Sequence, residues 1–102
     1  MPVVKAKRNI VLAQQSVNLD KALELAKNAH QLLPRDLGVM DTLGFVYLRR
    51  REYNQAIQTL ESALDLQEAE HPAGTPVAEL RQHLAQAYRL AGRTSDADAL
   101  SR

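Results

Sequence analysis

The sequence predicts an all-α fold in which antiparallel helix hairpins stack side by side. Three observations lead to this prediction. Apolar residues recur every three or four positions, which is the helical period, and no segment alternates strictly over strand length. Helix-capping and helix-breaking residues divide the chain at short intervals. The apolar pattern of one hairpin then recurs further along the chain, as expected for units that bury their apolar faces against one another.

The first well-defined helix is predicted to begin near Leu19, because the side-chain oxygen of Asn18 can accept a hydrogen bond from its first turn. Pro34 is expected to end this helix, since proline lacks an amide proton and clashes with the preceding turn. An earlier helix, from about residue 3, is expected to pair with it. The apolar residues of the helix that begins near Leu19 fall on one stripe: Leu19, Ala22, Leu23, Ala26, Ala29 and Leu33.

Two further helices are expected to form the next hairpin. Asp36 is positioned to cap the first of them, which should run to about Arg50. The second should run from about Glu52 to about Ala69. Because the connection between them is short, the two helices must run antiparallel.

A loop and a third, shorter hairpin follow. Residues 71–74 (His-Pro-Ala-Gly) have the composition of a loop. Thr75 followed by Pro76 predicts a helix start, since threonine is a good capping residue and proline suits the first helical position. Gly92 should end that helix, and a short final helix should begin at residue 94 or 95.

Comparison of the chain with itself defines the repeating unit. A shift of 34 residues places four apolar residues on four others: Ala22, Leu23, Ala29 and Leu32 on Ala56, Ile57, Ala63 and Leu66. A shift of 41 places Leu43, Gly44, Tyr47 and Ala56 on Leu84, Ala85, Tyr88 and Ala97. The longer shift matches an insertion around residues 71–74. We therefore predict one domain over residues 1–102, with repeats at about 3–36 and 37–70, a loop at about 71–75 and a partial repeat at about 76–102.

The middle repeat carries a recognisable signature. Residues 43–47 (Leu-Gly-Phe-Val-Tyr), followed by Ala56, Leu60 and Ala63, resemble the tetratricopeptide repeat (TPR) pattern. Residues 84–88 repeat its first part. In the middle repeat, Met40 and Leu60 replace the Trp and Phe of the pattern. The first repeat departs from the pattern at three positions, where Leu, Gly and Tyr are replaced by Asn9, Ile10 and Ala13. The small residues Gly44 and Ala56 would let two helices approach closely.

The resemblance implies a TPR-type α-solenoid, a right-handed superhelix of about 2.5–3 repeats. The run Asp41-Thr42-Leu43-Gly44 after Pro34 looks like the terminal repeats of large bacterial TPR proteins. By this resemblance, the first helices of the hairpins would line a concave groove that binds a peptide or partner helix. The groove residues would be Lys7, Val11, Gln14, Asp41, Phe45, Leu48, Arg49, Gln82, Gln86 and Arg89. Phe45 either anchors a ligand side chain or packs on the neighbouring hairpin.

A second hypothesis is self-assembly. The chain ends at Arg102, inside what should be the second helix of the third repeat, so it is expected to belong to a longer array or to pair with another chain. That short helix is expected to leave part of an apolar stripe poorly covered. Homodimers or stacked arrays would then form through Leu80, Leu84 and Ala87.

Composition and motifs argue against other classes of function. The formal net charge of +1 and the aromatic content of 4% do not suggest a nucleic-acid partner, and we interpret residues 49–51 (three arginines) as cations at a helix C-terminus and a solvated turn. The chain has no cysteine, and His30, His71 and His83 lack metal-ligand spacing. No nucleophile motif or phosphate loop is present. We therefore expect no enzymatic activity, no cofactor and no metal.

Membrane insertion is not expected either, because no apolar run approaches the ~18 residues that a membrane span needs. The sequence shows no secretory signal. It therefore leaves the compartment open between cytoplasm and periplasm.

Overall fold

The computed structural model describes residues 18–71 and 77–100, and every regular element in this part of the chain is a helix. Residues 18–32 form the first helix described. Four more follow: α2 (Leu37–Arg49), α3 (Tyr53–Glu70), α4 (Val77–Leu90) and α5 (Thr94–Leu100). The predicted start signal Thr75-Pro76 and the predicted groove residues Lys7, Val11 and Gln14 lie outside the described residues.

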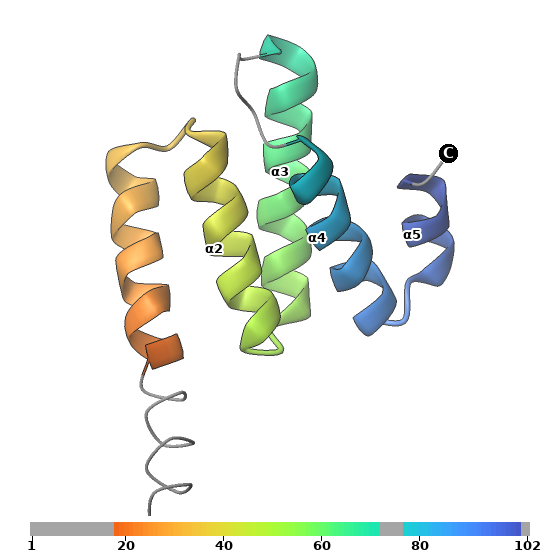
Figure 1. Ribbon diagram of the computed structural model, residues 1–102, viewed down its shortest axis with the longest axis horizontal. Coiled ribbons are helices and arrows are strands. Elements are labelled where there is room, and N and C mark those ends of the chain that lie inside the picture. The colour runs from red at the N-terminus through yellow and green to blue at the C-terminus, as the bar shows by residue number, and fades with distance from the viewer. Residues whose placement is uncertain (1–17, 72–76, 101–102) are drawn as a thin grey trace, which may run out of the picture.

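The helices stand side by side in an open row (Figure 1). The 18–32 helix lies at one end beside α2, and α5 lies at the other end beside α4. We call α2 with α3 hairpin 2, and α4 with α5 hairpin 3. Within the row α2 packs on α3, α3 on α4, and α4 on α5, and α4 also contacts α2. This arrangement confirms the prediction of an all-α helical repeat.

Local signals set most of the helix boundaries. The amide of Val39 donates to Asp36 Oδ1 at 2.9 Å, so Asp36 caps α2 as predicted. Gly92 has a φ of 82°, a left-handed conformation that glycine adopts without strain, and it follows the end of α4. Asn18 is itself helical, so its predicted role as the capping residue is wrong, since a cap needs a non-helical backbone. The observed bounds of α2 and α3 agree with the predicted ones to within one residue.

Hairpin 2 is held together by a close approach of its two helices at Gly44. A Cβ atom at this position would lie 2.5 Å from both Cγ and Cδ2 of Leu60 on α3. Leu60 is fully buried, as are Ala56 and Ala63 on the same helix. Only glycine leaves room for a leucine here, which confirms the expected role of Gly44.

Hairpin 3 packs on hairpin 2 through α4, and one polar contact joins α4 to α3. The hydroxyl of Tyr88 donates to Glu61 Oε2 on α3, and the Arg93 guanidinium carbon lies 4.7 Å from the centre of the Tyr88 ring. Burial of the ring, followed by the hydrogen bond to the Glu61 carboxylate, raises the pKa of Tyr88 from 10.0 to about 12.

The three residues of α4 that were predicted to mediate self-association are buried. Leu80 and Leu84 are each 1% exposed and Ala87 is 0% exposed. They belong to one core cluster with Leu60 of α3 and Ala97 of α5. The short helix α5 therefore covers α4 on one side while α3 covers it on the other, and these three residues form core and not a free self-association surface.

Candidate functional site

The contact between α2 and α4 carries a group of polar and aromatic side chains. Asp41, Phe45 and Arg49 are spaced four residues apart on α2, which places them on one helix face. His83 on α4 lies against them. We call these four residues the α2–α4 cluster.

Its geometry is defined by three contacts. His83 Nδ1 and Asp41 Oδ1 are 2.8 Å apart, which is a hydrogen-bonding distance. The His83 and Phe45 rings have centroids 4.8 Å apart and are tilted by 37°. The Arg49 guanidinium carbon lies 6.0 Å from the centre of the Phe45 ring, at the outer limit of a cation–π contact.

The cluster presents both an apolar and a cationic surface. Asp41, Phe45 and His83 are half-buried, whereas Arg49 is exposed. Phe45 packs on the neighbouring hairpin through His83, which is one of the two alternatives considered for this residue, and it is half-buried. Its role as an anchor for a ligand side chain stays a prediction. His83 contacts both Asp41 and Phe45, so it joins these two side chains of α2 to α4.

The remaining predicted groove residues do not all join this cluster. Leu48 is 4% exposed and lies in the core cluster, so it cannot contact a ligand, and its assignment to the groove is wrong. It lies one turn after Gly44, on the face of α2 that packs against α3. Gln82 and Arg89 instead line a cleft between α4 and α5, and Gln86 is exposed on α4.

Sequence reasoning missed His83, which was considered only as a metal ligand and was not among the predicted groove residues. It lies 42 residues from Asp41 in the chain. The shift of 41 that relates the two hairpins places His83 on Thr42, directly after Asp41. This equivalence to a residue beside Asp41 was the sequence signal that could have identified His83. It predicts a contact only when the offset between successive hairpins is already known.

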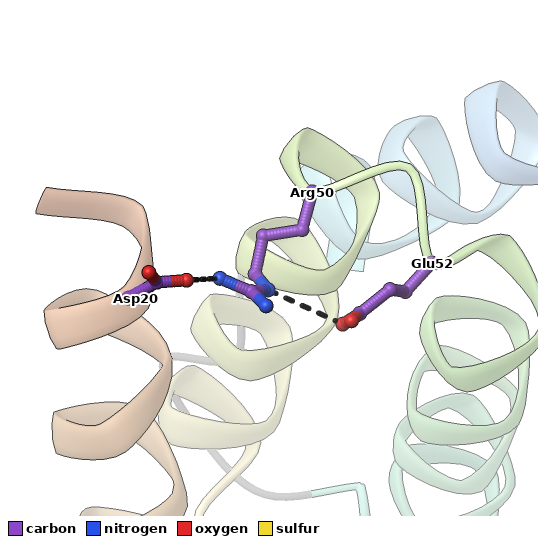
Figure 2. Close-up of polar contacts among 3 residues, drawn as sticks. All are labelled: Asp20, Arg50 and Glu52. Atoms are coloured by element: carbon purple, nitrogen blue, oxygen red, sulfur yellow. Dashed lines mark hydrogen bonds and ion pairs between the residues drawn. The ribbon is translucent and has the colours of Figure 1, made fainter. Parts of the chain in front are cut away.

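The three arginines at residues 49–51 have different structural roles. Arg50 binds Asp20 of the 18–32 helix and, at 3.3 Å, Glu52 of the α2–α3 turn, as Figure 2 shows. These two hydrogen bonds, the one to Asp20 first, raise the pKa of Arg50. Arg51 has a φ of 64° and forms the left-handed turn into α3, while Arg49 faces Phe45. Arg50 therefore ties the first described helix to hairpin 2.

Within residues 18–71 and 77–100, no group of three or more His, Cys, Asp or Glu side chains is arranged to hold a metal ion. In the same part of the chain, no helix has both the length and the apolar character to cross a bilayer.

Stacked helix hairpins with an accessible face on their first helices define this chain as a helical repeat protein. More specifically, it belongs to the tetratricopeptide repeat family, whose family model matches residues 36–102. The match begins at the residue that caps α2 and extends through hairpins 2 and 3. No curated protein and no solved structure gives a match. Tetratricopeptide repeats generally mediate protein–protein interactions, and the family typically provides non-enzymatic scaffolds.

Proposed function

We propose that this chain binds a peptide or helix of a partner protein across the α2–α4 cluster. The observation that carries the proposal is the pairing of a partly accessible aromatic ring, Phe45, with an exposed cation, Arg49, on a face fixed by the Asp41–His83 contact. Aromatic residues and arginine are the side chains that most often dominate binding energy at protein interfaces.

The chemistry of the cluster specifies the partner further. An apolar side chain of the partner would pack on the open part of the Phe45 ring, where it loses contact with water. Arg49 forms no ion pair with the described acidic residues, so its guanidinium is available to a partner carboxylate. The expected recognition element is therefore an apolar residue next to an acidic one.

The test is affinity capture with the wild-type chain and the double variant Phe45→Ala/Arg49→Ala, with recovered proteins quantified by mass spectrometry. A matched control is Lys21→Ala/Lys27→Ala, because both lysines are exposed on the 18–32 helix and distant in sequence from the cluster. We expect the cluster variant to lose specific partners by tenfold or more, as hot-spot truncations of about 2 kcal/mol do, while the control retains them. Equal recovery by all three proteins would remove the proposal.

Self-association is a second candidate function, now on different residues. Leu25 is 59% exposed and Leu32 is 81% exposed, and they lie two turns apart on the 18–32 helix. Exposed apolar patches on helices are frequent protein interfaces. If this face pairs two chains, light scattering should show a dimer for the wild type and a monomer for Leu25→Ser/Leu32→Ser. A wild-type monomer at high concentration would exclude it.

A further inference from the structure

A pocket of about 300 Å³ lies between the beginning of the 18–32 helix and the end of α2. This volume is at the lower end of the range for sites that bind small molecules. The pocket is lined by Leu19, Asp20, Arg49, Arg50 and Arg51, and we call it the arginine pocket. Its lining holds three positive charges and one negative charge, which leaves a net charge of +2.

Arg50 supplies a fixed guanidinium group to the arginine pocket. Its Nη1 binds Asp20 and its Nε donates to Glu52 at 3.3 Å, so contacts on two sides hold the group in place (Figure 2). Its third nitrogen, Nη2, has no hydrogen-bond partner among the residues that the structure describes. Because an arginine has five N–H donors, Arg50 retains donors for a bound anion.

Arg51 occupies a backbone conformation that is unfavourable for a residue with a side chain. Its φ of 64° is left-handed, and the shift of 41 residues that relates hairpins 2 and 3 places it on Gly92, which has a φ of 82°. Glycine adopts this conformation without strain because it has no Cβ atom, whereas arginine does not. Backbone strain of this kind is concentrated at functional sites. Hairpin 2 therefore has an arginine where glycine would form the more stable turn.

The chain has no carboxylate side chain that neutralises Arg49 or Arg51. All 12 Asp and Glu residues of the sequence lie within the described ranges 18–71 and 77–100. None of them forms an ion pair with either arginine. Residues 1–17, which precede the pocket in the chain, contain three cationic residues and no acidic one. The charge that would balance the pocket must therefore come from another molecule.

We propose that the arginine pocket binds the phosphate group of a small phosphorylated molecule. A phosphate monoester carries a charge of about −1.5 to −2 at pH 7, which matches the lining. Its oxygens accept the paired N–H groups that an arginine presents. None of the lining residues is aromatic. A single-stranded nucleic acid is held by a groove that follows its backbone and by aromatic side chains that stack on its bases, so a small molecule suits this pocket better.

The probes are inorganic phosphate, glycerol 3-phosphate and adenosine 5′-monophosphate, titrated into the full chain at constant ionic strength with chloride as the background anion. They distinguish free phosphate, a lipid-headgroup phosphate and a nucleotide as the source of the group. Binding is followed by NMR, and we expect saturable shifts that are largest at the amides of residues 50–52.

Arg51→Gly is the decisive variant because binding and stability should change in opposite directions. Its affinity for the best probe should fall by about tenfold or more, since a charge-assisted hydrogen bond is lost. Without phosphate it should melt at a higher temperature than the wild type, because the left-handed turn is then relaxed. A purely structural role of Arg51 would not produce this pair of changes. Arg51→Asn is a second variant, since asparagine tolerates the left-handed region and carries no charge.

Two control variants should bind the probes as the wild type does. Arg89→Gln removes one positive charge outside the arginine pocket, so it tests for a general effect of net charge. Phe45→Ala alters the α2–α4 cluster and leaves the lining of the pocket intact. It separates this site from the surface in the proposed function, to which Arg49 also belongs.

Four outcomes would overturn the proposal. The first two are that no probe binds, and that both Arg51 variants bind as tightly as the wild type. The third is loss of binding in Phe45→Ala, which would move the ligand to the α2–α4 cluster. The fourth is a single-stranded oligonucleotide that requires Arg51 and binds more tightly than every small probe, which would assign the pocket to nucleic acid.

Discussion

Hairpins 2 and 3 derive from the same repeat pattern but are supported in different ways. Hairpin 2 pairs a 13-residue helix with an 18-residue helix and brings them together at Gly44, where no side chain intervenes. In hairpin 3 the 14-residue α4 packs on α5, of which seven residues are described, and the equivalent of Gly44 is Ala85. Hairpin 3 relies on hairpin 2 for its core, because α4 packs against both α2 and α3. Both hairpins thus share the apolar residues of the repeat pattern, but the residue at the contact between their two helices differs in size.

The largest effect is expected at the contact on which hairpin 2 depends. Gly44→Leu should lower the free energy of unfolding by about 3 kcal/mol, because its side chain would overlap Leu60 in a core without free space. Chemical denaturation monitored by circular dichroism measures the change. Gly38→Ala on the same helix is the control, since a Cβ there lies 3.3 Å from only the Asp36 side chain. Equal stability of the two variants would contradict the close approach of α2 and α3 at Gly44.

The next effect concerns Tyr88 of hairpin 3. Its pKa of about 12 in the folded chain lies above the ordinary value of 10.0, so the stability that its neutral hydroxyl contributes is complete below pH 10 and is lost as the pH rises through 12. The loss should be about 2 kcal/mol. Unfolding measured from pH 9 to 12 should show it in the wild type and in Tyr47→Phe, the equivalent tyrosine of hairpin 2, but not in Tyr88→Phe. A loss of the same size in Tyr88→Phe would count against this assignment.

A smaller effect is expected where the two hairpins meet on the α2–α4 cluster. Asp41 and His83 are half-buried and 2.8 Å apart, so removing both in a double-mutant cycle should reveal a coupling of about 1 kcal/mol. The variants are Asp41→Ala, His83→Ala and the pair, compared by denaturation. Additive single effects would show that the contact does not help to hold hairpin 3 against hairpin 2.

The smallest effect is expected at the other side of hairpin 2. Arg50 and Asp20 join it to the 18–32 helix through an ion pair in contact with solvent. Arg50→Ala should lower the melting temperature by less than Asp41→Ala does, and about 1 M salt should remove most of the difference from the wild type. A salt-independent change larger than that of Asp41→Ala would reverse the ranking.

The features that were predicted from sequence depend on neighbouring residues or on the spacing of the repeat. Asp36 caps α2 through an amide three residues away, and Gly44 faces the second helix of its own hairpin. The errors concern burial, which depends on how the helices pack together. Leu48 lies one turn after Gly44 on the α2 face that packs against α3, and Leu80 lies in the core cluster that α4 shares with α3 and α5.

His83 shows the same limit at the candidate site. Its meeting with Asp41 depends on the offset and twist between successive hairpins, which a repeat pattern alone does not specify. Phe45 and Arg49 could be proposed because the resemblance to tetratricopeptide repeats implies that they line the groove together with Asp41. The shape of the surface that they form depends on α4.

The double contact of α4 also sets the order in which the chain opens. Among the labelled helices, α5 contacts only α4, so its release breaks one interface, whereas detaching α4 breaks the contacts with α2 and α3 together and frees α5 as well. Amide hydrogens of α5 should therefore exchange with solvent well before those of α4. The amide hydrogens of α4 and of hairpin 2 should exchange at similar rates, because α4 and hairpin 2 open together.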